Sequence, residues 1–343
     1  MKSKSLYLVE PGRVEVMERD IQIKPTEVLV KTAYSSICGT DRNHFMGFMQ
    51  RGSRTRDNVR ASMSGFGHSR GYPLLLGHEG CGTVVEVGSA VTTCKVGDLI
   101  SSFAEGGTMG EYFACPAVEE GYGLNVVAPG TLTPLQASQG EPAGCAIYAG
   151  LQSGVEVGDT VVVVGVGFAG QIIAQVVKRM GAWKVIVADI VDGKLELAKQ
   201  LGADVTINPH KEDFVERVLE ETNGVGADVC IEVGGTTETV QMCTDVLKHG
   251  GILGMYSWIM DPVSNLYIDR WHDDGFDIRT LALMHRIHHD RIWYIKQAMS
   301  LIEKGLVKIE PLLTHVFTLD EAQKAFEVAR DDNKVCKVAF KFD

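Results

Sequence analysis

The chain has 343 residues, of which 45% are hydrophobic and 22% are charged, values typical of two folded domains and not of a disordered protein. Acidic residues outnumber basic ones by 44 to 33, and a net charge of −11 would repel a phosphate backbone, so we expect no nucleic acid among the partners.

Membrane and secretory signals are also not expected. The longest apolar run, VVVVGVGFAG from Val161, is too short and too rich in glycine to span a bilayer, and the run LYLV stops at Glu10. The 8 cysteines are scattered singly, without the dense spacing of a disulfide scaffold. We therefore predict a cytoplasmic protein whose cysteines are buried apolar residues or metal ligands.

The predicted elements change in character along the chain. Residues 1–150 contain short alternating runs such as EVLVKTAYS, GTVVEVGSAV and GDLISSF, which predict a β-rich region. From Gly158, continuous apolar runs (TVVVVGV, KVIVADI, ADVCIEV, GGILGMYS) alternate with helical segments, as in a parallel sheet covered on both faces. Near the end, a helix from Asp320 precedes the alternating strand VCKVAFKF, which is similar in pattern to the first region.

A glycine pattern lies between the first of these apolar runs and a helix. Gly165, Gly167 and Gly170 have the spacing G-x-G-x-x-G, which allows a tight turn, close approach of a pyrophosphate and packing of helix on strand. The amino terminus of the helix then offers free N–H groups to the anion. The pattern predicts a dinucleotide site.

Asp189 ends the next strand, nineteen residues after Gly170, at the offset where an acid accepts hydrogen bonds from the adenosine ribose. Its carboxylate would repel a 2′-phosphate, and the following Ile190, Val191 and Asp192 supply no arginine to bind one. We therefore predict NAD and not NADP.

The segment ICGTDRNHFMG places Cys38, Thr40, Asp41 and His44 close together. By itself it is compatible with part of a metal site, with a nucleophile or with a tight turn, because a free cysteine most often behaves as a small buried apolar residue.

Motifs along nearly the whole chain resemble those of zinc-dependent medium-chain dehydrogenases of the alcohol, polyol and threonine dehydrogenase group. They are CGTD at 38–41, GHEGCGTVVEVG at 77–88, VGDLI at 96–100, EPAGCAIYAG at 141–150, LGAD at 201–204 and PLLTHVFTLDEAQKAF at 311–326. The resemblance implies an α/β protein in which a β-rich catalytic domain (1–150 and 295–343) is interrupted by a Rossmann NAD-binding domain (151–294). It also implies a homodimer or homotetramer.

The resemblance also implies a catalytic zinc. Its ligands would be Cys38, His78 and Glu141, with Glu79 as a direct or exchanging ligand. One thiolate, one imidazole and carboxylates suit Zn²⁺, and a catalytic zinc keeps a position open for substrate. Thr40 would hydrogen-bond the reacting oxygen. The implied cofactor contacts are Gly165, Gly167, Phe168, Ala169, Gly170, Asp189 and Lys194.

The chain departs from the family pattern in its opening motif. Family members commonly carry a relay histidine where this chain has Asn43, and His44 comes one residue later. Either His44 takes that role through a shifted loop, or water and the cofactor ribose suffice. Asp41 is expected to be an acid that steadies the site from behind the ligands, or else a turn former.

Two further departures concern a metal lobe and an insertion. Where relatives carry four cysteines for a structural zinc, this chain has only Cys115, so we predict one zinc per chain. The segment 51–70 is rich in arginine (Arg51, Arg54, Arg56, Arg60, Arg70), which is compatible with a solvated loop or with attraction of an anionic substrate.

The sequence thus predicts a zinc enzyme that transfers a hydride from a secondary alcohol to NAD, the substrate being a polyol, a sugar derivative or a hydroxy amino acid, including anionic ones. The alternatives are a zinc-free double-bond reductase of the same superfamily and a non-enzymatic nucleotide-binding protein. The measured zinc content distinguishes the zinc enzyme from the zinc-free reductase. Binding of NAD without turnover of any alcohol would favour the non-enzymatic protein.

Overall fold

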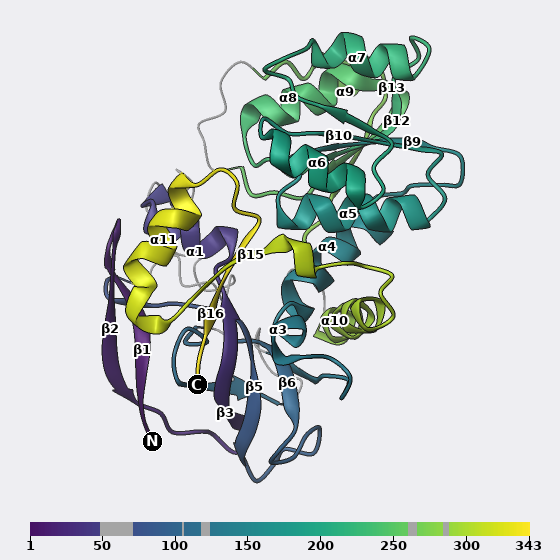
Figure 1. The fold of residues 1–343 in the computed structure, drawn as a ribbon. Helices are drawn as coiled ribbons and strands as arrows, with labels where there is room; N and C mark the ends of the chain where they lie inside the picture. Colours follow the sequence, from purple (N-terminus) through teal and green to yellow (C-terminus); the bar gives the residue numbers. More distant parts are fainter. Residues whose placement is uncertain (49–70, 105, 118–123, 260–265, 284–287) are drawn as a thin grey trace. The chain divides into compact units, whose positions relative to one another are not determined.

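The computed structural model describes residues 1–48, 71–104, 106–117, 124–259, 266–283 and 288–343 (Figure 1). The chain divides into two compact units, a β-rich unit (1–144 and 286–343) and an α/β unit (145–285). The predicted boundaries at 150 and 295 lie six and nine residues beyond these limits. None of the helices in the described ranges combines the length and the apolar character that crossing a bilayer requires.

The β-rich unit contains two sheets. A seven-stranded sheet has the order β15-β16-β3-β5-β6-β8, with β7 also paired to β3, and a three-stranded sheet has the order β2-β1-β4. The strands are β1 (Lys2–Glu10), β2 (Arg13–Asp20), β3 (Glu27–Ser36), β4 (Leu74–Leu75), β5 (Glu79–Val87), β6 (Leu99–Phe103), β7 (Tyr112–Pro116), β8 (Leu124–Val127), β15 (Leu313–Phe317) and β16 (Lys337–Lys341).

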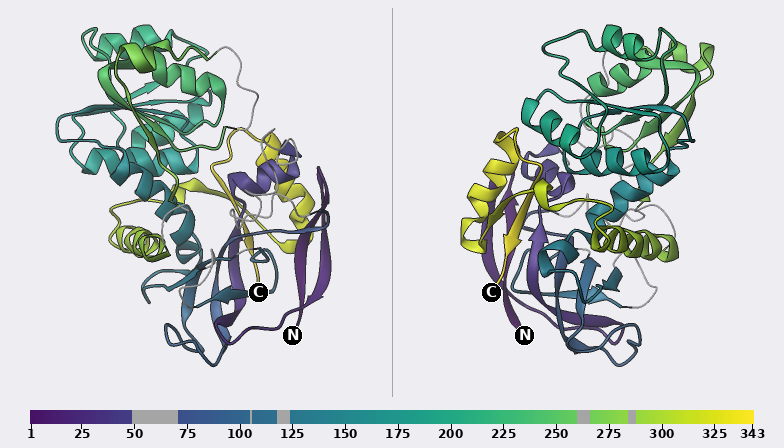
Figure 2. Two further views of the ribbon diagram at one scale, coloured as in Figure 1. Left: turned by 180° about the vertical axis from the view of Figure 1, so that it is seen from behind. Right: turned by 45° about the vertical axis from the view of Figure 1, so that its right-hand side comes forward.

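The helices of this unit are α1 (Gly39–Phe45), α3 (Pro134–Ala137), the start of α4 (Gly140–Gln152), α10 (His288–Glu303) and α11 (Ala322–Asp331), with short 3-10 turns at η3 (Glu310–Leu312) and η4 (Leu319–Glu321). Phe45 of α1, Phe326 of α11 and Phe340 of β16 pack together in one core cluster. The end of the chain therefore closes the core that its beginning starts, and β16 lies beside β3 (Figures 1 and 2).

The α/β unit is a six-stranded parallel sheet in the order β11-β10-β9-β12-β13-β14. Its strands are β9 (Thr160–Val164), β10 (Lys184–Ala188), β11 (Val205–Ile207), β12 (Ala227–Glu232), β13 (Leu247–Met255) and β14 (Asp277–Thr280), and its helices are α5 (Phe168–Arg179), α6 (Asp192–Gln200), α7 (Phe214–Glu221), α8 (Thr237–Val246) and α9 (Asp269–Asp273). The strand order reverses between β9 and β12, where ligands bind in doubly wound sheets.

Both faces of this sheet are covered. Alternate residues of β9 and β10, together with Phe214 and Val218 of α7 and Cys243 of α8, form one core cluster. Helices α5 and α6 pack on β9, β10 and β11. Burial on both faces explains why these strands are continuous apolar runs, and the predicted α/β class is confirmed.

Arg270 of α9 completes the end of α8. Its Nη1 donates to the carbonyl oxygens of Thr244 at 2.9 Å and Asp245 at 3.0 Å, and its Nη2 donates to that of Leu247 at 3.0 Å. The last carbonyls of a helix have no partner within the helix, so this guanidinium supplies the bonds that α8 would otherwise lack.

We expect Arg270→Met to lower the free energy of unfolding by roughly 2 kcal/mol, because it strands these carbonyls. Urea denaturation checks this value. Arg217→Met on α7 is the matched control, since Arg217 forms ion pairs with glutamate side chains at a partly exposed site, worth at most about 1 kcal/mol. Equal losses in the two variants would contradict the capping role.

Candidate active site

The motif CGTD lies at the junction of β3 and α1. Cys38 is the residue before the first turn of α1, and Asp41 Oδ2 accepts a hydrogen bond from the Cys38 backbone N–H at 3.0 Å. This is a capping-box arrangement, in which the third helical residue reaches back to the start of the helix. The turn-forming role considered for Asp41 is therefore present, and it fixes where the Cys38 side chain begins.

His78 and Glu79 enter the same region from the start of β5. Gly77 has φ +88°, and a Cβ there would lie 2.5 Å from the backbone nitrogen of Met109, so only glycine fits this turn. The His78 ring packs edge-on against Phe103 with a centroid distance of 5.6 Å. His78 and Glu79 are both buried, as are the nearby charged residues Asp41 and Lys337.

Asp41 also faces His78. Its Oδ1 lies 3.6 Å from His78 Nδ1, so one carboxylate contacts both the backbone of Cys38 and the imidazole. Burial of the His78 ring opposes its charge, but Asp41 and Cys38 outweigh burial and raise the pKa of His78 well above its ordinary value. Burial acts against the charge of Asp41 too, yet His78 and the Cys38 N–H lower the pKa of that carboxyl. Beyond its capping role, Asp41 thus faces the imidazole, the arrangement expected of an acid that steadies the site.

Three potential metal ligands converge here. The ligand atoms of Cys38, His78 and Glu79 all lie within 4.8 Å of one another, and no other group of three or more His, Cys, Asp or Glu among the described residues meets this condition. A soft thiolate, an imidazole and a carboxylate form a donor set that fits Zn²⁺. The Thr40 hydroxyl lies 3.9 Å from Cys38 Sγ.

Glu141 and His44 lie outside this trio. Glu141, the second residue of α4, is buried, and its charge contributes to the raised pKa of Lys337, a neighbour of Glu79. His44 is half-buried on α1, and its charge helps to lower the pKa of Asp41. His44 is therefore close to an acid of the site, although it does not belong to the convergent group of Cys38, His78 and Glu79.

Lys337 is a member of this region that the sequence did not reveal. It is the first residue of β16, its side chain is 6% exposed, and its Nζ lies 2.5 Å from Glu79 Oε2. Burial alone would lower the pKa of Lys337, but Glu79 and then Cys38 outweigh it and raise the pKa. The sequence could have drawn attention to Lys337, because it stands in the largely apolar run VCKVAF. In an alternating strand, however, a lysine is normally expected to face solvent.

The three glycines of the nucleotide motif have different tasks in the α/β unit. Gly165 has φ +93°, and a Cβ there would lie 2.7 Å from the backbone nitrogen of Gly234. A Cβ on Gly170 would lie 2.0 Å from the carbonyl oxygen of Gly165, so this glycine lets α5 pack on β9. Gly167, the residue before α5, has nothing within 4 Å of its would-be Cβ. Open space over a helix amino terminus fits a pyrophosphate.

Asp189 lies at the same edge of the sheet. Its Oδ2 accepts a hydrogen bond from the Val166 N–H at 2.9 Å, and its Oδ1 accepts one from the Val191 N–H at 3.0 Å. Each oxygen keeps a lone pair for a further donor, as two ribose hydroxyls require. Phe168 and Ala169 form the first turn of α5, and Lys194 lies in the first turn of α6.

Glu232, at the end of β12, was not anticipated. It is completely buried, and its Oε1 accepts hydrogen bonds from the Gly235 N–H at 2.6 Å and the Thr239 hydroxyl at 2.7 Å. These bonds fix the segment after β12, which faces Gly165 across the point where the strand order reverses. Burial raises the pKa of Glu232, and the bonds from Gly235 and Thr239 oppose this rise only in part.

The raised pKa of Glu232 predicts a pH dependence of stability. Between its ordinary pKa in the unfolded chain and its higher pKa in the folded chain, the folded state binds more protons, so stability falls as pH rises through this window. The slope reaches about 1.4 kcal/mol for each pH unit. We expect Glu232→Gln to remove this contribution in urea denaturation curves taken from acid to neutral pH. Glu238→Gln, at an exposed position of α8, should leave the curve unchanged; identical curves for wild type and Glu232→Gln would contradict the assignment.

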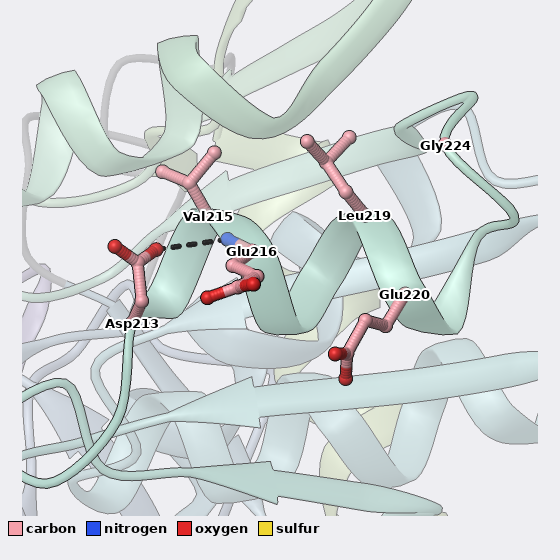
Figure 3. Close-up of a pocket in the computed structure, with 6 residues that line it drawn as sticks. All are labelled: Asp213, Val215, Glu216, Leu219, Glu220 and Gly224. Atoms are coloured by element: carbon pink, nitrogen blue, oxygen red, sulfur yellow. Dashed lines mark hydrogen bonds between the residues drawn. The ribbon is translucent and has the colours of Figure 1, made fainter.

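A surface hollow on the α/β unit does not belong to either site. It is lined by residues of α7 and its flanking turns, and Figure 3 shows Asp213 Oδ1 accepting a bond from the Glu216 N–H at 2.8 Å. That contact is an ordinary helix cap. The arginine-rich segment 51–70 lies outside the described residues, and Cys115 is a buried residue of β7.

Comparisons with known proteins show to which family the chain belongs. Residues 24–141 match the alcohol dehydrogenase GroES-like domain, and residues 169–300 match the zinc-binding dehydrogenase domain. An L-threonine 3-dehydrogenase of Pyrococcus abyssi is 30% identical and covers 99% of this chain and 97% of its own. A D-arabitol-phosphate dehydrogenase of Enterococcus avium is 28% identical over 90% of this chain and 88% of its own.

A solved structure described as a zinc-binding dehydrogenase from Sinorhizobium meliloti 1021, bound to NADP, superposes with a TM-score of 0.81 at 25% identity over 99% of both chains. The superposition covers both units, and each unit also matches one of the two family domains. The protein belongs to the zinc-type medium-chain dehydrogenases and is an oxidoreductase of the alcohol dehydrogenase class.

Proposed function

We propose that this dehydrogenase oxidises a secondary alcohol with NAD, and that the β-rich unit provides the catalytic zinc site and the α/β unit the cofactor site. The observation that carries the proposal is the convergence of Cys38, His78 and Glu79 within 4.8 Å in a buried region. A thiol, an imidazole and a carboxylate this close together form a donor set that suits a zinc ion.

The residues of the site have separate tasks in the proposed reaction. Cys38 and His78 would hold zinc with a carboxylate from Glu141 or Glu79, and zinc would supply the Lewis acidity that lowers the pKa of an alcohol hydroxyl. Asp41 keeps the imidazole in place through its Oδ1. The Thr40 hydroxyl, next to Cys38 Sγ, is placed to accept the substrate hydroxyl proton and pass it on. His44 remains a candidate for the next step of that relay.

NAD is the proposed cofactor because Asp189 directs a carboxylate at the edge where a 2′-phosphate would lie. The S. meliloti protein binds NADP, so members of this fold differ in this respect. The substrate class is proposed to be a polyol, a sugar derivative or a hydroxy amino acid. The L-threonine and D-arabitol-phosphate dehydrogenases among the relatives favour the last of these classes and a phosphorylated polyol as the first compounds to test.

The test is an activity screen with a metal assay on the same preparation. NAD reduction is measured with polyols, sugar acids, phosphorylated and sulfonated alcohols and L-threonine, and zinc is counted by elemental analysis. We expect turnover with at least one class and one zinc per chain. Two zinc ions per chain would contradict the single-site prediction. An enzyme without zinc that reduces an activated double bond would replace the proposal by the zinc-free reductase.

A further inference from the structure

Lys337 is a buried cation whose presence stability does not explain. Its side chain and that of Glu79 are 6% and 2% exposed, and Nζ lies 2.5 Å from Oε2. Removing two charges from water costs several kcal/mol for each ion, and apolar residues of similar volume often stabilise a protein as well or better. A buried pair of this kind next to potential metal ligands therefore suggests a role in the chemistry of the site.

The strand order brings the pair to the end of β3. Strands β16 and β5 flank β3, and Ser36 pairs with Ala339 on one side and with Glu79 on the other. Cys38 follows two residues after Ser36. The ion pair thus spans the point at which the chain turns toward the cysteine ligand.

Glu79 consequently has two competing partners. Its carboxylate lies within 4.8 Å of the ligand atoms of Cys38 and His78, close enough to join a metal bound by them. On its other side it meets the ammonium of Lys337. The ammonium and the carboxylate carry opposite charges and lie 2.5 Å apart in a buried place, so they attract each other strongly.

We propose that Lys337 is a positioning residue that holds the Glu79 carboxylate off a metal bound to Cys38 and His78, and so keeps one coordination position open for the substrate oxygen. The inference rests on the proposed zinc site and assigns the resting third ligand to Glu141. It adds to that site a residue that sets the access of exogenous ligands to the metal. Without the ammonium, the Glu79 carboxylate would be free to coordinate the metal and would occupy the position meant for the substrate oxygen.

The test uses the full-length protein loaded with Co²⁺ in place of zinc, because the visible bands of Co²⁺ report its coordination. Imidazole serves as a small probe for the open position, and its dissociation constant is obtained by titration of the Co²⁺ bands. We expect Lys337→Met to weaken imidazole binding about tenfold or more, a normal size for coupling between neighbouring sites. Lys337→Arg keeps the charge and should bind imidazole like the wild type.

Two variants of Glu79 decide the mechanism. Lys337→Met combined with Glu79→Gln should restore the imidazole affinity, because the competing carboxylate is gone. Glu79→Gln alone should bind imidazole as the wild type does, since Glu79 is not a ligand in the resting state. A rise in affinity of about tenfold in this single variant would overturn the inference even if Lys337→Met does not fold.

Failure of this inference is distinguishable from failure of the zinc site. Unchanged imidazole affinity in folded, Co²⁺-loaded Lys337→Met overturns the role of Lys337 and leaves the metal site standing. Failure of the wild type to bind Co²⁺ or zinc at all overturns the proposed metal site and this inference with it.

Discussion

Replacing Cys38 by alanine is expected to remove the metal and to lower kcat/KM for the best alcohol by at least about 1,000-fold. The Lewis acidity of a bound zinc is worth several kcal/mol in the transition state, and each 1.4 kcal/mol is a factor of ten in rate. Cys38 carries the thiol of the convergent trio, and the cap of α1 fixes its backbone. The measurements are zinc content by elemental analysis and steady-state kinetics.

Cys115→Ala is the matched control for this experiment. Cys115 is also in the β-rich unit, but it is a fully buried residue of β7 and outside the convergent group. It should lose some stability through a small cavity and keep its zinc and its kcat/KM. A Cys38→Ala protein that retains one tightly bound zinc would refute the assignment of Cys38 as a ligand.

Replacing Asp189 by serine together with Ile190→Arg is expected to reverse the cofactor preference. The change removes a negative charge from the ribose edge and adds a guanidinium that pairs with a 2′-phosphate. Loss of one repulsion and gain of one charge-assisted bond should shift the ratio of kcat/KM for NAD and NADP by about 100-fold or more, since charged hydrogen bonds contribute about 1.5–3 kcal/mol each. Steady-state kinetics with both cofactors measure the ratio.

Two controls separate charge from structure in this experiment. Asp189→Asn removes the charge but keeps the size of the side chain and one of its two oxygens. That oxygen can still accept a hydrogen bond from the N–H group of Val166 or Val191. Asp192→Ser removes a nearby exposed acid that pairs with Lys211. It should leave the cofactor ratio unchanged. If the double replacement also leaves the ratio unchanged, Asp189 does not select the cofactor.

The inferred role of Lys337 fits a wider pattern, in which charged residues surround the proposed zinc site. Asp41 accepts a bond from the Cys38 backbone and faces the His78 ring, and Lys337 contacts the Glu79 carboxylate, so charged groups adjoin all three convergent residues. A site arranged in this way has preset ligand positions before any metal is bound. Such neighbours commonly alter metal affinity or activity by 10–100-fold when they are changed.

The sequence by itself determined the fold class and the nucleotide edge. Continuous apolar runs that alternate with helices are typical of a parallel sheet covered on both faces, and β9 to β13 confirm that interpretation. The glycine motif and Asp189 lie on adjacent strands of one sheet, so the geometry of a single β-α-β unit brings them together. Local periodicity and spacing are sufficient for features of this kind.

The metal region was predicted through motif resemblance, and the folded chain brings Cys38, His78 and Glu79 together. Their binding of zinc remains a prediction. The residues that the sequence did not single out are Lys337, Glu232 and Arg270. Each acts through a partner distant along the chain or through backbone groups that carry no sequence signal.

The pair of Lys337 and Glu79 shows the difference most clearly. From the sequence, a lysine in the alternating strand VCKVAFKF is expected to face solvent. In the folded protein β16 lies between β15 and β3, and β5 lies on the other side of β3. The side chain of Lys337 is buried there and meets a carboxylate 258 residues earlier in the chain. Residue type and local spacing determined which chemical groups this protein has available. The order of the strands determined which of the charged groups must pair, because only tertiary packing removes the water that would otherwise separate them.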